Sequence, residues 1–205
     1  MAWSALSVPS SSPPRLVVVR HGATEWSSSG RHTGRTDIPL TTEGEAQARA
    51  LAPRLAGLDV ARVLTSPLAR ARMTCALAGF GGRAEPDPDL AEWDYGRYDG
   101  LTRAEIRAQR PDWDLWADGP PGGETIDQVA ARAGRVVAAV AGGSGDVIAF
   151  AHGHVLRIVA TCWLGVDPRQ GRLLRFSPTG VGVLAWENER PVLSRWNDDG
   201  GPFLR

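Results

Sequence analysis

The sequence predicts an α/β fold, a three-layer α/β/α sandwich with a mostly parallel central sheet. Short apolar runs that read as buried strands alternate with segments of helical period. The chain has 205 residues, which is enough for a single domain with its own core. In addition, His21-Gly22 and His152-Gly153 each stand where an apolar run meets a turn. The carboxyl ends of strands are where open α/β sheets bind ligands, so these pairs mark the expected site.

Six segments are expected to be strands because each is short, apolar and followed by turn-forming residues. They are Leu16–Arg20, Arg62–Thr65, Val147–Ala151, Leu173–Phe176, Val181–Trp186 and Val192–Arg195. The first and third of these end at the two His-Gly pairs, so both pairs should reach one edge of the sheet.

Helix-start signals define two helices between the first strands. Glu43–Leu55 follows Thr42, which can form a capping box with Glu45. Pro67–Leu77 has Ser66 as its expected N-cap and a proline at the first helical position. Both helices should therefore pack against the sheet between consecutive strands.

Two further helices and two irregular regions complete the pattern. Thr125–Val140 carries apolar residues along one face, and Gly153–Leu164 should form a helix after the second His-Gly pair. Trp26–Pro39 and Leu90–Gly123 show no regular period. We expect these loops to roof the site, because binding residues are often carried on loops over a rigid scaffold.

The domain boundaries follow from composition. Residues 1–14 contain a Ser- and Pro-rich run and are expected to be a flexible tail. Residues 15–205 should form one domain, with the roof as an insertion around residues 90–123.

Charge and composition exclude several functions. The 23 basic and 23 acidic residues balance, which argues against nucleic acid or an anionic membrane surface as partner. Every basic side chain is arginine, so neither Schiff-base chemistry nor a lysine-dependent phosphate loop is possible. No segment is apolar enough to span a membrane. Cys75 and Cys162 are expected to be buried free thiols rather than partners in a disulfide bond. Free thiols are typical of the reducing cytoplasm, so a cytoplasmic location is expected.

Candidate catalytic residues surround the two His-Gly pairs. A neutral imidazole of His21 can attack phosphorus, and the neighbouring Arg20 offers paired donors for phosphate oxygens. Arg70 near a helix start and a protonated His152 would complete an anion cage. Glu92 is the preferred general acid for protonating the leaving oxygen. For a lone histidine or arginine, a core or surface role would be the default interpretation.

Other residues are weaker candidates. Asp94 and Asp99 are alternative acids, although both suit turn or cap positions. The loop from Gly30 to Asp37 offers donors to an anion, although a solvated turn would be its default interpretation. His154 could face the substrate or pack under the sheet, and the sequence does not decide between the two.

Six short motifs resemble the histidine phosphatase superfamily, formerly the phosphoglycerate mutase family. In chain order they are Arg20-His21-Gly22-x-Thr24, Thr33-Gly34, Leu40-Thr41-x-x-Gly44, Ser66-Pro67-Leu68-x-Arg70, Glu92-x-x-Tyr95-Gly96 and His152-Gly153. The resemblance runs from about Leu16 to Trp186. Within the superfamily, the chain is similar in particular to the sedoheptulose-bisphosphatase type and to small actinobacterial acid phosphatases.

The resemblance implies a phosphoglycerate mutase-like fold and a metal-independent phosphomonoesterase without a cofactor. The substrate would be a small phosphate ester such as a sugar phosphate, and inorganic phosphate or sulfate could occupy the site. His21 would form phosphohistidine, Arg20, Arg70 and His152 would hold the phosphoryl oxygens, and Glu92 would act as acid. Substrate-binding positions would be Thr24, Ser27, Thr33, Gly34, Tyr95, Gly153 and His154. A monomer or homodimer is expected.

Departures from the family pattern favour a phosphatase over a phosphoglycerate mutase, which is the alternative. Ser27 stands where many members of the family have asparagine. The cofactor-dependent mutases follow the Glu motif with Arg-His-Tyr-Gly and then a lysine, whereas this chain has Trp93-Asp94-Tyr95-Gly96 and no lysine. A zinc site built on the His-x-His pair is disfavoured, because Arg20 and Arg70 would repel a dication. A catalytically silent binding module is disfavoured because no member of the expected cage is missing.

Overall fold

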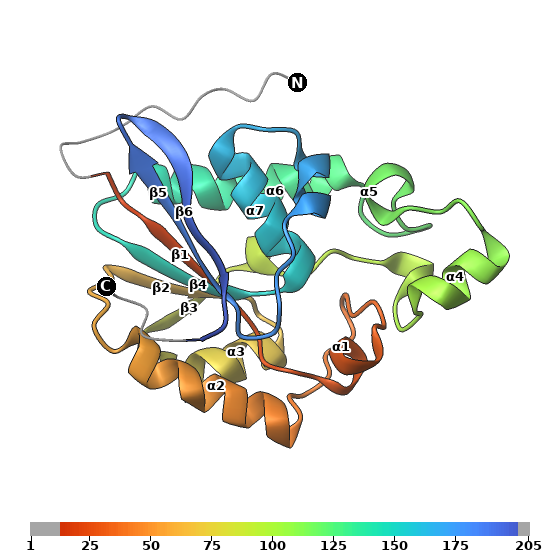
Figure 1. The fold of residues 1–205 in the computed structure, drawn as a ribbon, viewed down its shortest axis with the longest axis horizontal. Coiled ribbons are helices and arrows are strands. Elements are labelled where there is room, and N and C mark those ends of the chain that lie inside the picture. The colour runs from red at the N-terminus through yellow and green to blue at the C-terminus, as the bar shows by residue number, and fades with distance from the viewer. Residues whose placement is uncertain (1–12, 201–205) are drawn as a thin grey trace.

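The computed structural model describes residues 13–200, so residues 1–12 of the expected tail lie outside the described residues. A six-stranded sheet forms the centre, with the strand order β3-β2-β4-β1-β5-β6 (Figure 1). The strands are β1 (Leu16–Arg20), β2 (Arg62–Thr65), β3 (Ala84–Pro86), β4 (Val147–Ala151), β5 (Val181–Glu187) and β6 (Arg190–Asp198). The first four are parallel to one another, whereas β5 and β6 are antiparallel to their neighbours. The predicted mostly parallel sheet is confirmed.

Helices cover both faces of the sheet, as predicted. Helices α2 (Thr42–Leu55) and α3 (Ala69–Leu77) lie on one face, and α6 (Ile126–Ala141) and α7 (Gly153–Leu164) lie on the other (Figure 1). Successive side chains of β1 point to opposite faces of the sheet, and both sets are buried under helices. Val17 and Val19 belong to the buried cluster with α2, while Leu16 and Val18 belong to the cluster with α6 and α7.

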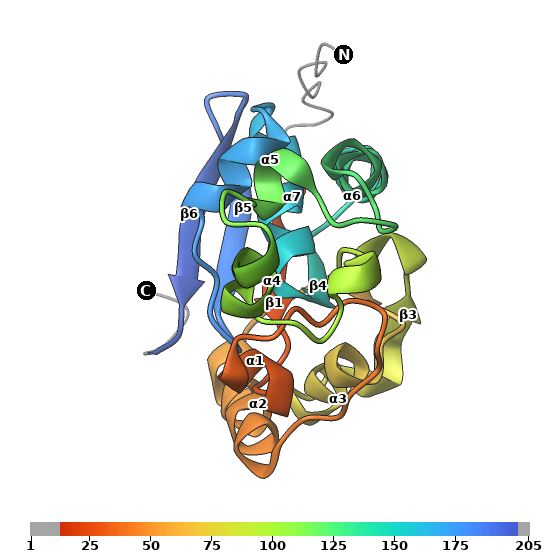
Figure 2. The same cartoon turned by 90° about the vertical axis from the view of Figure 1, so that its right-hand side faces the viewer.

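The predicted roof lies over the carboxyl ends of the parallel strands. It contains α1 (Glu25–Ser29), α4 (Arg103–Gln109) and α5 (Leu115–Asp118), which face the viewer in Figure 2. Short 3₁₀ turns complete the described chain at Gly81–Arg83, Pro88–Leu90, Gly96–Tyr98 and Pro168–Leu173. Loops and short helices therefore enclose the edge at which both His-Gly pairs emerge.

Two strand predictions were wrong. Leu173–Phe176 is not a strand, because the 3₁₀ turn Pro168–Leu173 occupies its start and Leu173 is 70% exposed. The segment is apolar in sequence, but it has no sheet neighbour. Conversely, β3 was missed because it has only three residues, two of them exposed, and ends in proline.

Two helix starts also differ from the prediction. Helix α2 is capped by Thr41, whose hydroxyl accepts from the Gly44 amide, so the predicted Thr42–Glu45 capping box does not form. Helix α3 begins at Ala69 rather than Pro67, and its N-cap makes no side-chain hydrogen bond. The expected cap, Ser66, accepts from the Leu68 amide at 3.3 Å and is also hydrogen-bonded to His152.

The loop after β1 is held close to the start of α2. A Cβ atom on Gly22 would lie 2.3 Å from the Gly44 carbonyl oxygen, and one on Gly44 would lie 2.0 Å from that of Ala23. The Thr41 amide also donates to the Ala23 carbonyl at 3.0 Å. Glycine at both positions permits this approach, which fixes the backbone beside His21.

Both cysteines are free and buried, as predicted. Burial raises the pKa of the Cys75 and Cys162 thiols to about 12, so both stay protonated near neutral pH. Among residues 13–200, no helix has the length and apolar character needed to cross a membrane.

A single buried arginine of α6 positions the segment that carries Glu92. Arg132 is 7% exposed and pairs with both carboxylate oxygens of Glu124, at 2.9 and 3.0 Å. It also donates to the carbonyl groups of Asp89 and Ala91, immediately before Glu92. The start of the roof is therefore joined to α6 through one guanidinium group.

We expect Arg132→Leu to lower the free energy of unfolding by about 3–5 kcal/mol, because it leaves a carboxylate and two carbonyl groups without their partner. Urea unfolding followed by circular dichroism measures this change. Arg135→Leu, one turn away on the same helix, is the matched control because Arg135 is exposed and pairs with Asp89 at the surface. Equal losses in the two variants would contradict this structural role for Arg132.

Candidate active site

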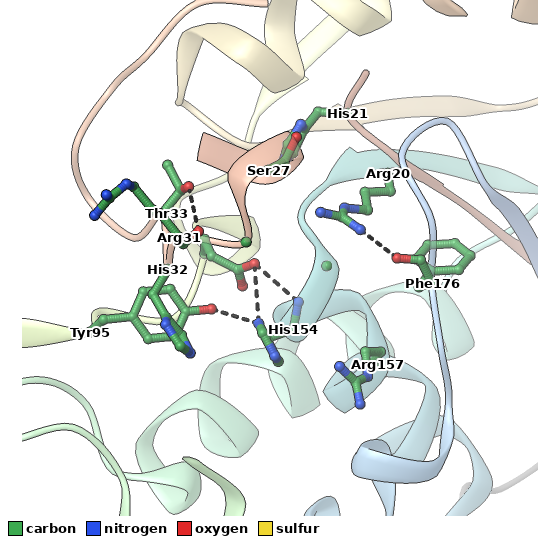
Figure 3. A pocket seen from close by; sticks show the side chains of 13 residues that line it. Arg20, His21, Ser27, Arg31, His32, Thr33, Tyr95, His154, Arg157 and Phe176 are labelled. Atoms are coloured by element: carbon green, nitrogen blue, oxygen red, sulfur yellow. Dashed lines mark hydrogen bonds and ion pairs between the residues drawn. The ribbon is translucent and has the colours of Figure 1, made fainter. Parts of the chain in front are cut away.

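A cavity of about 190 Å³ opens at the carboxyl ends of β1 and β4 (Figure 3). Its walls come from β1, the loop around α1, the roof, the start of α7 and the segment before β5. The lining residues are Arg20, His21, Ser27, Gly30, Arg31, His32, Thr33, Glu92, Tyr95, Gly153, His154, Arg157 and Phe176. Eight of the twelve predicted site residues line this cavity.

His21 is buried at the cavity wall, and among residues 13–200 its Nε2 has no hydrogen-bond partner. Its Nδ1 lies 2.7 Å from the Gly22 carbonyl oxygen, which can only accept, so Nδ1 carries the proton and Nε2 keeps a lone pair. Burial lowers the pKa of His21 well below its usual value, and the nearby Arg20 and Arg70 charges lower it further. The imidazole is therefore neutral at physiological pH and can act as a nucleophile.

Arg20 extends into the cavity beside His21 (Figure 3). Its Nη1 donates to the Phe176 carbonyl at 2.6 Å, while its buried Nε has no hydrogen-bond partner within residues 13–200. A Cβ atom on Gly153 would lie 3.3 Å from the guanidinium carbon, so glycine gives Arg20 its space. A buried donor without an acceptor is costly, and an oxyanion in the cavity would satisfy it.

Arg70 and His152 lie directly behind the cavity wall rather than in it. Both are completely buried, and the His152 ring centre lies 5.2 Å from that of His21. Arg70 Nε donates to His152 Nδ1 at 3.1 Å. Its other donors bind the carbonyl groups of Thr33, Gly34 and Thr36. Through these hydrogen bonds, Arg70 connects α3 to the loop of residues 33–36 and to the end of β4.

The prediction that His152 is protonated was wrong. Its Nδ1 accepts from Arg70, and its Nε2 lies 2.7 Å from the Ser66 hydroxyl, so the ring is neutral with the proton on Nε2. Burial and the Arg70 charge lower the pKa of His152 well below its usual value. The positive charge of the site comes from the arginines, and the two imidazoles beside them are neutral.

Glu92 occupies the N-terminus of α7 and lines the cavity. Its Oε1 accepts from the backbone amides of Trp93 and Val155, each at 2.9 Å, and its Oε2 accepts from that of His154 at 3.0 Å. The amide groups at the start of α7, which can bind an anion, therefore bind this carboxylate. Its rotation is fixed, and the carboxylate lies in the same cavity as Arg20 and His21.

Tyr95 and His154 form a second pair in the cavity wall. The Tyr95 hydroxyl lies 2.6 Å from His154 Nδ1. Burial lowers the pKa of His154 well below its usual value and raises that of Tyr95, so both groups are uncharged. The structure thus decides the open alternative for His154, which faces the cavity.

Two predicted substrate-binding residues lie outside the cavity lining. Thr24 is completely buried, and its hydroxyl caps α1 by accepting from the Ser27 amide at 3.1 Å. Gly34 places its carbonyl against Arg70 at 2.9 Å. Ser27 and Thr33 do line the cavity, although Ser27 also completes the capping box of α1. Thr24 and Gly34 therefore shape the loop instead.

The alternative acids have structural partners. Asp94 pairs with Arg35 at 2.6 Å and accepts from the Gly96 amide. Asp99 accepts from the Gly34 amide and from Thr36. Neither lines the cavity, which leaves Glu92 as the carboxylate in position. Within residues 13–200, no group of three or more His, Cys, Asp or Glu side chains could hold a metal ion.

The structure adds cavity residues that the sequence did not identify as site residues. His32, in the glycine-containing loop, donates from Nδ1 to the Leu101 carbonyl at 2.9 Å and presents its ring to the cavity. Its position in that loop was a weak signal. Arg157 and Phe176 carried no sequence signal, because only packing of α7 and of the segment before β5 brings them here.

Taken together, the site combines three chemical groups. It offers a neutral imidazole with a free lone pair, buried guanidinium charge from Arg20 and Arg70, and a fixed carboxylate on Glu92. This set can bind an anion, attack it and exchange a proton with a departing oxygen.

Comparisons with known proteins agree with this chemistry. The chain is 41% identical over 179 residues to an acid phosphatase of Mycobacterium tuberculosis, covering 85% of this chain and 87% of that protein. It is 37% identical over 186 residues to sedoheptulose 1,7-bisphosphatase of Saccharomyces cerevisiae, covering 75% and 68%. A 2,3-bisphosphoglycerate-dependent phosphoglycerate mutase of Gloeobacter violaceus is 35% identical over 161 residues, covering 70% and 73%.

A solved structure of a Mycobacterium tuberculosis open reading frame superposes with a TM-score of 0.84 at 36% identity, covering 90% of this chain and 97% of that one. Residues 16–199 match the family model of the histidine phosphatase superfamily, branch 1. The resemblance seen in the sequence motifs is confirmed, and the chain belongs to the histidine phosphatase superfamily.

Proposed function

We propose that this protein is a phosphatase that hydrolyses small phosphate monoesters through a phosphohistidine on His21, without a metal ion. The observation that carries the proposal is the neutral His21, whose Nδ1 donates its proton to the Gly22 carbonyl and whose Nε2 has no partner in the described part of the chain. The relatives named as phosphatases support the same activity. A cytoplasmic location and a monomeric or homodimeric state remain predictions from the sequence.

In the first step, His21 Nε2 attacks phosphorus and the ester P–O bond breaks. Arg20 donates to the phosphoryl oxygens, and the buried charge of Arg70 adds to the positive potential around them. Glu92 gives a proton to the departing alcohol oxygen.

In the second step, water attacks the phosphohistidine and the N–P bond breaks. Glu92, now ionised, accepts a proton from that water, and inorganic phosphate leaves. His21 Nε2 regains its lone pair, while Nδ1 keeps its proton on the Gly22 carbonyl throughout. The fixed Nδ1 hydrogen bond therefore holds the nucleophile in one orientation for both steps.

We expect His21→Ala to reduce hydrolysis of p-nitrophenyl phosphate by at least about 10³-fold, because no other group supplies the nucleophile. Mass spectrometry of wild type denatured at alkaline pH, where the N–P bond survives, should detect one added phosphoryl group, which this variant should lack. Thermal unfolding shows whether the variant is folded. Full activity in a folded His21→Ala protein would overturn the proposal.

The mutase alternative is tested with 3-phosphoglycerate and 2,3-bisphosphoglycerate. A phosphatase releases inorganic phosphate, because water takes the phosphoryl group from His21. Rapid formation of 2-phosphoglycerate without released phosphate would instead show that the enzyme returns the group to the sugar acid.

We expect Glu92→Gln to slow an alkyl phosphate by about 10²–10⁴-fold and p-nitrophenyl phosphate considerably less, because nitrophenolate leaves without protonation. The measurement is the rate of alcohol release from each substrate in a single turnover, which isolates the first step. Asp94→Asn is the control, since Asp94 lies outside the cavity. Equal loss for both substrates would assign Glu92 to binding instead of proton transfer.

The kcat/KM for hydrolysis should begin to fall on the acid side only well below pH 6.5. Burial and the Arg20 charge lower the pKa of His21, so the nucleophile stays neutral as the pH falls through the ordinary histidine range. Activity is lost only when the pH falls through this lowered pKa. Titration of the His21 ring by NMR and the pH dependence of kcat/KM should agree. A ring that titrates at pH 6.5 or above would contradict the burial argument.

A further inference from the structure

The backbone at the nucleophile is paired at every polar group. The amide and carbonyl groups of His21, Gly22 and Ala23 all have hydrogen-bond partners. In chain order of these groups, the partners are the Ala151 carbonyl, the Thr179 amide, the Thr74 hydroxyl, the His21 ring, the Gln47 side-chain oxygen and the Thr41 amide. Two partners are thus side chains from other helices, Thr74 on α3 and Gln47 on α2, and substitution can remove them.

Thr74 fixes the peptide group between His21 and Gly22. Its hydroxyl accepts from the Gly22 amide at 3.0 Å and donates to the Arg70 carbonyl at 2.7 Å. Because a hydroxyl group has a single hydrogen, which goes to Arg70, its lone pairs are left for the Gly22 amide. Thr74 is completely buried, so loss of the hydroxyl would leave that amide without a partner.

Gln47 fixes the next peptide group, whose carbonyl accepts the Nδ1 proton of His21. The Gly22 carbonyl and the Ala23 amide belong to one planar unit, so holding one end orients the other. The Ala23 amide donates to Gln47 Oε1 at 3.0 Å, and the Gln47 amide nitrogen donates to Glu43 at 3.1 Å. Glycine at position 22 would otherwise let this unit turn and carry its carbonyl away from His21.

The carbonyl performs the task that a carboxylate performs in a Ser-His-Asp triad. There the carboxylate accepts the Nδ1 proton, so that Nε2 keeps its lone pair. Here the hydrogen bond from Ala23 to Gln47 polarises the peptide group and strengthens the Gly22 carbonyl as an acceptor. Without that acceptor the proton can move to Nε2 of His21, and the lone pair that attacks phosphorus is lost.

We propose that Thr74 and Gln47 are positioning residues, which keep His21 in the tautomer and orientation needed for attack by holding the peptide groups on both sides of Gly22. The inference rests on the proposed phosphohistidine mechanism. It extends that mechanism to two helices that supply no group to the reacting atoms.

Neither residue acts on the substrate directly. A second cavity of about 290 Å³ adjoins the active site, with His32, His154 and Arg157 lining both. Thr74 and Gln47 belong to the walls of neither cavity. Their effect on the reaction therefore passes through the backbone beside the nucleophile.

The first test removes the Thr74 hydroxyl while keeping the shape of the side chain. Thr74→Val should slow nitrophenol release from p-nitrophenyl phosphate in a single turnover by about 10-fold, and Thr74→Ser should stay within about twofold of wild type. The inhibition constant of inorganic phosphate, which binds without being attacked, should change by less than about twofold. Thr161→Val is the matched control, because Thr161 is equally buried on α7 and donates to the Ile158 carbonyl, away from the site.

The second test uses Gln47, which is only half-buried, so its variants should fold. Gln47→Met removes the acceptor and should slow nitrophenol release by about 10-fold, whereas Gln47→Glu keeps an acceptor oxygen and should stay close to wild type. The spectroscopic readout is ¹⁵N NMR of the His21 ring, identified by the signal that His21→Ala lacks. Wild type should carry the proton on Nδ1, and Thr74→Val and Gln47→Met should each show a share of it on Nε2.

The inference is overturned if Thr74→Val and Gln47→Met both release nitrophenol at the wild-type rate. It is also overturned if Thr74→Ser is as slow as Thr74→Val, or if His21 keeps its Nδ1 proton in both slow variants, because a purely structural role would then explain the loss. Thermal unfolding checks each variant, and Gln47→Met decides if Thr74→Val is unfolded. Failure of wild type to hydrolyse p-nitrophenyl phosphate would instead count against the phosphatase function, while the tautomer of His21 would still test the positioning.

Discussion

The site depends on the burial of two guanidinium groups beside two neutral imidazoles. Taking Arg20 and Arg70 out of water is costly, and backbone carbonyl groups offset much of that cost. The acceptors are the carbonyls of Phe176 for Arg20 and of the 33–36 loop for Arg70. Each arginine therefore joins segments that are distant in sequence. Misplacing either arginine would leave a buried charge without its partners, so the fold and the anion site are stabilised together.

This arrangement also determines the protonation of the histidines. Positive charge and burial act in the same direction, and both disfavour imidazolium. His21 consequently keeps the lone pair that a nucleophile needs, and His152 accepts from Arg70 instead of contributing charge. In the proposed mechanism, the arginines supply the electrostatic attraction, while the imidazoles supply a nucleophile and a positioning contact.

The roof performs a different task from the sheet. Strands β1 and β4 place Arg20 and His21 at the cavity and His152 behind its wall, and the start of α7 holds the Glu92 carboxylate beside them. In the proposed mechanism, Arg20, His21 and Glu92 act on the phosphoryl group. The roof and the 3₁₀ turn Pro168–Leu173 supply aromatic and arginine side chains farther out.

The sequence by itself determined the layered fold, the strands that end at the two His-Gly pairs and the family. Alternating burial along strands and capping residues at helix starts are local signals, and the motifs are contiguous. Only the tertiary structure decided that Arg70 lies behind the cavity wall, that His152 is neutral and that Thr24 caps a helix. It also revealed His32 and Arg157 at the boundary of a second cavity. These properties arise from contacts between residues far apart in the chain, and packing fixes such contacts while periodicity does not.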